Sequence, residues 1–191
     1  MALDDILSVL EGFDGMVIVD EAYIDFSQEH SLTALVDEYS NLVVLQTMSK
    51  SFGLAGIRLG IAIGSPEVIS YMMKVKAPYN VNKLTSRKAL DAFSSLDHVS
   101  KNIESILDER ERVIQRLITF EEVEYVHPTD ANFVLFKIQN ALEVYKKMAN
   151  QGVIIRYRGN EPHCEDCLRL TIGTAAENDR FFEALEQITN S

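Results

Sequence analysis

Residues 42–64 read LVVLQTMSKSFGLAGIRLGIAIG, and this stretch decides the fold. An apolar, β-branched run at 42–47 and a second apolar run at 57–64, bounded by glycines, predict two buried strands. The segment between them places Lys50 between two serines and just before several glycines. Glycine weakens helices and strands alike, so we expect a turn here, directly after a buried strand.

The neighbouring sequence places this turn within a larger sheet. MVIVDEAY at 16–23 predicts another buried strand, and HSLTALVDEY at 30–39 predicts a short helix. Residues 2–11 have the pattern of an amphipathic helix, and a serine and a proline open a further helix at 65–77. This alternation predicts an α/β fold with a parallel sheet, whose ligands bind at the carboxyl ends of strands. Asp20 and Tyr23 follow the first strand, and Ser49 and Lys50 follow the second.

A change of pattern at APYNVNKL, residues 77–84, indicates a second unit. We expect two helices over residues 82–120, meeting near SSLD at 94–97. Helices are also expected at 140–152, where Gly152 would end the helix, and at 174–188. Strands are expected at 123–128, 132–138, 153–158 and 167–173. The predicted division is therefore residues 1–78 and a separate α+β unit, residues 79–191.

Composition excludes several classes of function. The 191 residues carry a formal net charge of −11, which argues against nucleic-acid binding but still allows a local site for a small anion. No apolar run reaches the roughly 20 residues of a membrane span. The acidic start MALDDILSVL differs from a signal peptide, and only two cysteines are present. We therefore expect a soluble protein of a reducing, cytoplasmic compartment, with no membrane partner.

The two cysteines lie in HCEDC, residues 163–167. A zinc site needs four ligands, and the sequence has no second cysteine pair. A thioredoxin-like pair would stand where a strand enters a helix, whereas this polar run precedes a strand. A redox or zinc module around Cys164 and Cys167 remains an alternative, but we expect a polar loop with two thiols and no metal.

The turn after residue 47 has the residues of a carbonyl-binding and phosphate-binding site. A lysine amine is a nucleophile only in its neutral form, which partial burial favours. Ser49 and Ser51 offer hydroxyl groups, and the planar guanidinium of Arg58 suits a phosphate. Taken alone, the segment favours the alternative, a turn that carries an ordinary surface lysine, because short motifs often match by chance.

An acidic residue at the end of the preceding strand strengthens the interpretation as a cofactor site. Asp20 ends an apolar strand, where a carboxylate needs a positive partner such as a protonated pyridine nitrogen. Tyr23, three residues later, would reach a phenolic oxygen on the same ring. The alternative is that Asp20 only caps a following turn.

Together, DEAY at 20–23 and SKSFGLAGIRLG at 49–60 resemble the paired signature of the fold-type I aminotransferases that use pyridoxal phosphate. Within them the sequence is most similar to histidinol-phosphate aminotransferases. PYNVN, TDANFVLF, GVIIRYRG and CLRLTIGTAAENDRFFEAL follow in that family's order. The resemblance implies an aspartate-aminotransferase-like fold, of which residues 1–78 form part of the large, cofactor-binding domain and residues 79–191 form the small domain.

The resemblance also implies a role for each motif residue in binding pyridoxal 5′-phosphate. Lys50 would form the Schiff base with the cofactor and later move the proton between substrate and cofactor carbons. Asp20 would keep the pyridine nitrogen protonated, so that the ring acts as an electron sink. Tyr23 would hydrogen-bond the phenolic oxygen of the ring. The cofactor phosphate would be bound by Ser49, Arg58 and, as a weaker candidate, Thr47.

The substrate would be held by residues of the second unit. Arg169 matches the arginine that binds the acidic group of the substrate, and Arg156 matches a second arginine near the substrate phosphate. An arginine within the apolar run CLRLTIG also needs an anionic partner on physical grounds, for which Glu177 or Asp179 is the alternative. Asn132 and Tyr79 are further candidates, whose side chains would either contact substrate or serve packing and the junction between units.

Parts of the family pattern have no counterpart in this sequence. They are the amino-terminal arm, the glycine-containing phosphate loop, the aromatic residue that stacks on the ring, an asparagine at the phenolic oxygen, and a tyrosine lent across a homodimer interface. We therefore expect this chain to be the carboxyl-terminal part of a longer aminotransferase.

The expected reaction is amino transfer between glutamate and a phosphorylated imidazole ketone in histidine biosynthesis. Alternatives within the class are an aromatic amino-acid aminotransferase and a phosphothreonine decarboxylase-like enzyme. An alternative of another class is a folded, non-catalytic remnant that binds a partner but no cofactor.

Overall fold

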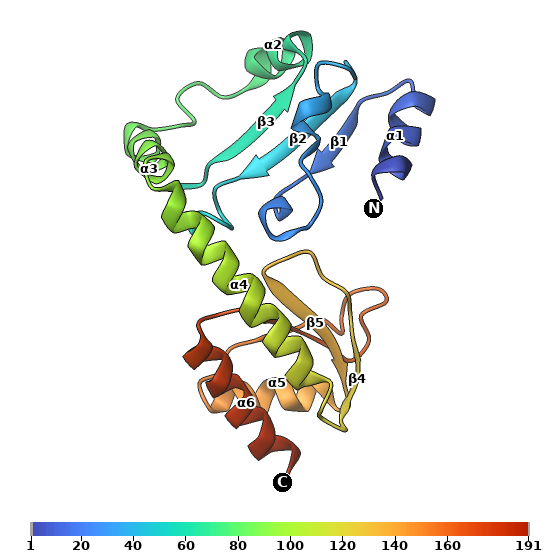
Figure 1. Ribbon diagram of the computed structural model, residues 1–191, viewed down its shortest axis with the longest axis vertical. Helices are drawn as coiled ribbons and strands as arrows, with labels where there is room; N and C mark the ends of the chain where they lie inside the picture. Colours follow the sequence, from blue (N-terminus) through green and yellow to red (C-terminus); the bar gives the residue numbers. More distant parts are fainter. Residues whose placement is uncertain (1, 191) are drawn as a thin grey trace. The chain divides into compact units, whose positions relative to one another are not determined.

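The computed structural model describes residues 2–190. The chain divides into two compact units, one up to Ser100 and the other from Lys101 onward (Figure 1). The domain boundary between residues 78 and 79 that the sequence favours stays a prediction. Each unit has its own sheet, and each is described here by itself.

The first unit is built on a three-stranded sheet with the order β1-β2-β3. Its strands are β1 (Val17–Asp20), β2 (Leu42–Thr47) and β3 (Gly60–Gly64). β1 and β2 pair in parallel, whereas β3 pairs antiparallel to β2. The expected all-parallel sheet is therefore wrong for β3. A parallel connection needs a long crossover, but residues 48–59 contain only turns and the short 3-10 helix η3 (Ala55–Ile57).

The helices of the first unit are α1 (Leu3–Gly12), α2 (Pro66–Val75) and α3 (Lys83–Phe93), with the 3-10 helices η1 (Ile24–Phe26) and η2 (Leu32–Leu35). Helix α1 and the 3-10 helix η2 pack on the sheet at β2, whereas α2 contacts β3. A small core joins α1 and η2 to β2 through Leu10, Leu32, Leu42 and Val44. The helix expected at 30–39 is limited to η2. The predicted cap of α2 is confirmed, because the Ser65 side chain accepts a hydrogen bond from the Val68 amide.

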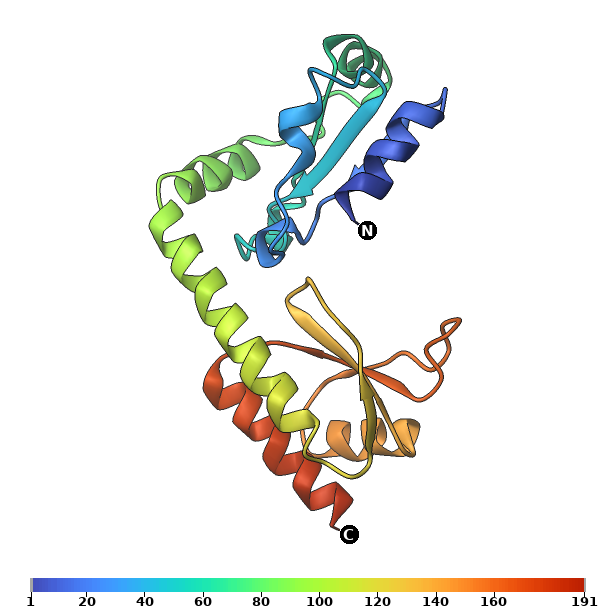
Figure 2. The same cartoon turned by 45° about the vertical axis from the view of Figure 1, so that its right-hand side comes forward.

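The second unit contains a four-stranded antiparallel sheet with the order β4-β5-β7-β6 (Figure 2). The strands are β4 (Val123–Val126), β5 (Phe133–Ile138), β6 (Arg156–Tyr157) and β7 (Cys167–Thr171). The helices are α4 (Leu96–Leu117), whose first turns precede the unit boundary, α5 (Ala141–Asn150) and α6 (Ala175–Thr189). The break between α3 and α4 falls at residues 94–95, within the predicted junction.

Alternation along β5 explains how this sheet buries one face. Val134, Phe136 and Ile138 are fully buried, while the residues between them are half-buried. Helices α4, α5 and α6 cover the buried face with side chains that include Val113, Met148, Phe181 and Leu185. The opposite face carries Phe133, Leu135 and Lys137 from β5, and across from Leu135 lies Arg169 of β7.

No helix within residues 2–190 is long and apolar enough to cross a lipid bilayer.

Candidate active site

The sequence candidates of the first unit gather near the ends of β1 and β2. These strands run in the same direction, with Asp20 opposite Leu45, so both lead their chains toward one edge of the sheet. Asp20 is the last residue of β1, and Thr47 is the last residue of β2. This is the edge at which open α/β sheets bind ligands.

Lys50 lies in the turn that follows β2. Its side chain is half-buried, and its Nζ atom lies over the Tyr23 ring, 4.9 Å from the ring centre. The turn is closed by a hydrogen bond of 2.9 Å from the Gly53 amide to the Lys50 carbonyl oxygen. Gly53 has φ +66°, a left-handed conformation that favours glycine. The structure therefore brings two of the three residues expected at the cofactor ring, Lys50 and Tyr23, into contact.

Hydroxyl groups form a second cluster beside the lysine. The Oγ1 atom of Thr47 lies 2.9 Å from Ser49 Oγ and accepts a 3.1 Å hydrogen bond from the Ser49 amide. Arg58 is exposed and left-handed, with φ 54°, and its Nη1 donates to the Ala55 carbonyl at 3.0 Å. Two hydroxyls and a guanidinium thus lie at the end of β2 and on the short connection that follows it.

Asp20 caps the turn that follows β1, which was the alternative to a role in binding the cofactor. Its Oδ1 atom accepts a 2.9 Å hydrogen bond from the Ala22 amide, and the residue is exposed. Within residues 2–190, Oδ2 has no hydrogen bond or ion pair. One carboxylate oxygen therefore fixes the turn after β1, and the other is available.

Glu21, which the sequence pattern did not indicate as a site residue, holds this turn in place. Only 6% of Glu21 is exposed. Its carboxylate accepts hydrogen bonds from Ser31 Oγ at 2.6 Å, the Leu32 amide at 2.7 Å and Gln46 Nε2 at 2.9 Å. These contacts join the loop after β1 to β2, because Gln46 belongs to β2. The available signal was a second acidic residue directly after an apolar strand, together with a glutamine in the next strand.

In the second unit, two candidate arginines lie opposite each other. Arg156 of β6 pairs in register with Arg169 of β7. The Arg169 guanidinium lies over the Phe133 ring at 5.0 Å, and its buried Nε atom has no hydrogen-bond partner within the described residues. Like charges directly across a strand pair are destabilising, and an unsatisfied buried donor costs further stability. An anion bound between the two side chains would relieve both costs.

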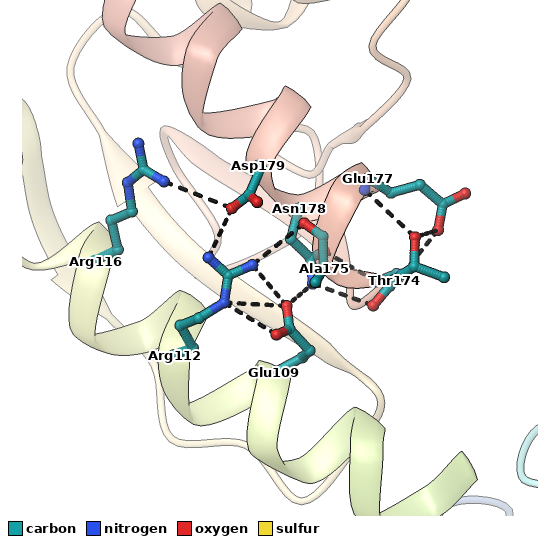
Figure 3. Close-up of polar contacts among 9 residues, drawn as sticks. Glu109, Arg112, Arg116, Thr174, Ala175, Glu177, Asn178 and Asp179 are labelled. Carbon is teal, nitrogen blue, oxygen red and sulfur yellow. Dashed lines mark hydrogen bonds and ion pairs between the residues drawn. The ribbon is translucent and has the colours of Figure 1, made fainter.

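The acids considered as partners of Arg169 are engaged elsewhere (Figure 3). Glu177 accepts from the amide and hydroxyl of Thr174 in a capping box at the start of α6. Asp179 pairs with Arg112 at 2.7 Å and lies 3.8 Å from Arg116. The structural alternative for Arg169, an ion pair with Glu177 or Asp179, is therefore wrong.

The same network fixes the turn between β7 and α6. Glu109 of α4 accepts from Arg112 at 2.7 Å and from Asn178 Nδ2 at 2.8 Å. Asn178, 1% exposed, also bonds the amide and the carbonyl of Gly173. Hydrogen bonds from Arg112 and then Asn178 lower the pKa of Glu109, and the bond to Glu109 raises the pKa of Arg112.

The remaining candidates contribute less to either cluster. Asn132 is half-buried at the start of β5, and its carbonyl accepts a 3.0 Å hydrogen bond from the Ile172 amide. Tyr79 is 96% exposed and left-handed, with φ 59°, in the connection between α2 and α3. The structure gives Asn132 a role in the sheet and shows Tyr79 on the surface.

The cysteine loop shows no metal cluster. Cys164 and Cys167 are free thiols, and the Cys167 sulfur lies 3.8 Å from His127 Nε2. Burial raises the pKa of the Cys167 thiol. Among residues 2–190, no group of three histidine, cysteine or acidic side chains is placed to hold a metal ion.

Comparison with known proteins decides the family. The sequence profile described as "Aminotransferase class I and II" matches residues 2–185. This chain belongs to the class I and II aminotransferases. As an aminotransferase, it is similar to the histidinol-phosphate aminotransferase of Flavobacterium johnsoniae, with 47% identity over 175 residues, 92% of this chain and 50% of that relative. The chain therefore spans about half the length of this curated relative.

Solved structures show that the aminotransferase fold is shared along the chain. The histidinol-phosphate aminotransferase from Clostridium acetobutylicum superposes with a TM-score of 0.91 at 24% identity, covering 100% of this chain and 60% of that one. The enzyme of the same name from Sinorhizobium meliloti, solved in complex with pyridoxal-5′-phosphate, gives a TM-score of 0.86 at 20% identity. It matches over 100% of this chain and 53% of that one. The fold and the family predicted from the motifs are confirmed.

Proposed function

We propose that this chain supplies the carboxyl-terminal catalytic machinery of a pyridoxal-phosphate-dependent histidinol-phosphate aminotransferase. The observation that carries the proposal is the half-buried Lys50 amine, directly after β2 and against the Tyr23 ring. The 47% identical relative from Flavobacterium johnsoniae supports the choice of substrate class. The proposed reaction moves an amino group between glutamate and the phosphorylated imidazole ketone of histidine biosynthesis.

The residues present fit the chemistry of the cofactor. An aldehyde requires an amine, which Lys50 supplies, and a protonated ring nitrogen requires an anion, which the available Oδ2 atom of Asp20 supplies. A phosphate requires several donors, and the hydroxyls of Thr47 and Ser49 lie on the same connection as the Arg58 guanidinium. Pyridoxal phosphate, when bound, supplies an electron sink for the breaking of a substrate C–H bond.

Each side chain has a stated task in this mechanism. Lys50 would hold the cofactor aldehyde through Nζ and would move the substrate proton as general base and acid. Asp20 would hold the protonated ring nitrogen, and Glu21 would position Asp20 by fixing the loop that follows it. The Tyr23 hydroxyl would hydrogen-bond the phenolic oxygen of the ring.

Substrate binding is assigned to the arginine pair of the second unit. Arg169 and Arg156 would neutralise the anionic groups of the amino donor and of the phosphorylated substrate, since two arginines opposite each other on paired strands suit carboxylate or phosphate oxygens. Asn132 and Tyr79 remain proposed substrate contacts. We further propose that the enzyme is a cytoplasmic homodimer, as the resemblance implies.

A titration with pyridoxal phosphate tests the proposal. The purified chain is tested alone and mixed with the complementary half, the half of the Flavobacterium johnsoniae relative that this chain does not match. A yellow adduct is expected. Borohydride then fixes the adduct on a peptide that contains Lys50. Lys50→Ala is expected to abolish the adduct, whereas Lys74→Ala, which removes an exposed lysine of α2, leaves it unchanged.

Two results would contradict the assignment. An adduct of normal yield in Lys50→Ala would show that another amine binds the aldehyde. Absence of any adduct in the wild-type chain, even with the complementary half bound, would favour the non-catalytic remnant.

A further inference from the structure

Ser51, the residue directly after Lys50, carries a buried hydroxyl. Only 6% of Ser51 is exposed, although serine is usually found on protein surfaces. Its Oγ atom donates a hydrogen bond to Oδ2 of Asp25, which belongs to the 3-10 helix η1. Because η1 follows β1 and Ser51 follows β2, this hydrogen bond joins the two loops that carry the candidate cofactor residues.

The acceptor of this hydrogen bond lies in an anchored segment. Tyr23 is the residue that precedes η1, and its carbonyl oxygen accepts a 3.0 Å hydrogen bond from the Phe26 amide. The Phe26 side chain is fully buried, and close packing around a buried ring allows it little movement. Asp25 therefore accepts its hydrogen bond from a fixed position, two residues after Tyr23.

The donor lies in a turn whose backbone is anchored in the same way. Met48 is 1% exposed, and its carbonyl oxygen accepts a 3.0 Å hydrogen bond from the Leu54 amide. The Lys50 side chain, in contrast, is a flexible four-carbon stem, so a fixed backbone alone does not determine where its Nζ atom lies. The position of the amine also depends on how closely the turn is held to the loop that supplies the Tyr23 ring.

Two other roles for the Ser51 hydroxyl agree less well with its surroundings. Its one O–H hydrogen is donated to Asp25, so the hydroxyl cannot also donate to a phosphate. Asp25 is exposed, and an exposed carboxylate exchanges a protein donor for water at little net cost in stability. The main consequence of the hydrogen bond is therefore the placement of the two loops rather than the stability of the fold.

We propose that Asp25 and Ser51 are positioning residues for the Lys50 amine. Their hydrogen bond holds the turn after β2 against η1 and thereby keeps the Lys50 Nζ atom at the Tyr23 ring. The catalytic consequence rests on the proposed function, in which this amine meets the cofactor aldehyde. The position of the amine itself can be measured without the cofactor.

Two forms of the cofactor distinguish positioning of the amine from a general effect on the site. The aldehyde of pyridoxal phosphate forms a C=N bond with an amine and releases water, whereas pyridoxamine phosphate has no aldehyde and cannot bond to Lys50. In the titration described above, Ser51→Ala and Asp25→Ala are expected to weaken pyridoxal phosphate binding about five- to tenfold, the value of one hydrogen bond. Pyridoxamine phosphate affinity should stay at the wild-type value. Wild-type affinity for pyridoxal phosphate in both variants, or equal losses for the two ligands, would overturn the proposal.

Further variants test whether the two side chains act through their shared hydrogen bond. Asp25→Asn keeps an acceptor oxygen and is expected to restore wild-type binding. The double variant Ser51→Ala/Asp25→Ala should lose no more affinity than either single variant, and additive losses would count against a shared role. Ser27→Ala is the matched control, because the Ser27 hydroxyl accepts from the Glu29 amide in the same loop. Asp25 is exposed, so Asp25→Ala tests the bond even if Ser51→Ala folds poorly.

Acetylation by limiting acetic anhydride, measured by mass spectrometry, tests the position of the amine without the cofactor. Release of Nζ from the Tyr23 ring in Ser51→Ala and Asp25→Ala is expected to speed acetylation of Lys50 about three- to tenfold. Lys74 is the internal control, since its Nζ atom lies 4.7 Å from the centre of the Tyr71 ring and should react at the wild-type rate. If the wild type forms no adduct with pyridoxal phosphate, the proposed function is wrong, and Lys50 acetylation alone then decides the positioning role. Equal Lys50 acetylation in wild type and variants would overturn it.

Discussion

The Nζ atom of Lys50 lies 4.9 Å above the centre of the Tyr23 ring, so the residues after β1 and after β2 meet at one edge of the sheet. In the proposed function, the Tyr23 hydroxyl binds the cofactor and the Tyr23 ring supports the lysine. Tyr23→Phe removes only the hydroxyl and is expected to weaken pyridoxal phosphate binding about tenfold, the value of one hydrogen bond to a charged or polar oxygen. Tyr23→Ala is expected to weaken it further. An absorbance titration that gives equal affinities for Tyr23→Phe and wild type would assign no binding role to the hydroxyl.

The facing pair Arg156 and Arg169 leads to a prediction about substrate. Arg169→Ala is expected to weaken histidinol phosphate binding by about 10- to 100-fold, since a hydrogen bond to a charged group contributes about 1.5–3 kcal/mol. Pyridoxal phosphate affinity should change much less. Arg158→Ala is the control, because Arg158 forms its ion pair with Glu161 at 3.5 Å. Calorimetric titration of the complex with both ligands checks this, and equal losses for the two ligands would count against a substrate role.

The Glu109 network predicts how stability depends on pH. The pKa of the Glu109 carboxyl is lowered in the folded chain. Glu109 therefore makes its full contribution to the free energy of unfolding above the ordinary carboxyl pKa of 4.5. That contribution is lost as the pH falls through the lower, folded-state value. Glu109→Gln keeps the side-chain shape but does not titrate, so the variant should lose less stability than wild type below about pH 4.5. Urea unfolding at pH 7, 5, 4 and 3 measures this, and parallel curves for the two proteins would exclude Glu109 as the cause.

Local sequence pattern predicted most of the elements and the position of the reactive turn. The strand at 42–47 and the glycines after it place Lys50 in a turn as observed, because an apolar run and the glycines that end it are local signals. The capping serine of α2 and the break at residues 94–95 are local for the same reason.

Features that depend on pairing could not be predicted in the same way. The antiparallel direction of β3 follows from the path of residues 48–59, and the facing of Arg156 and Arg169 follows from the β6–β7 register. The hydrophobic periodicity of the sequence predicts neither the direction of a strand nor its register with a neighbour. Glu21 looks like a surface acid until Ser31 and Gln46 are brought to it by the fold.

The unequal cores of the two units predict unequal stability within one chain. Amides of β5 and β7, beneath the fully buried Phe136 and Leu168, are expected to exchange slowest, because opening them exposes the larger core. Amides of β1 should exchange faster, since only four side chains form the buried core cluster that joins its sheet to α1 and η2. Phe136→Ala is expected to destabilise the second unit by about 3–5 kcal/mol, whereas Ile18→Ala, at an exposed position, should change stability by less than about 0.5 kcal/mol. Hydrogen exchange followed by mass spectrometry measures the first expectation and urea unfolding the second. Equal protection of β1 and β5 in the isolated chain would show that the first unit is stable without a partner.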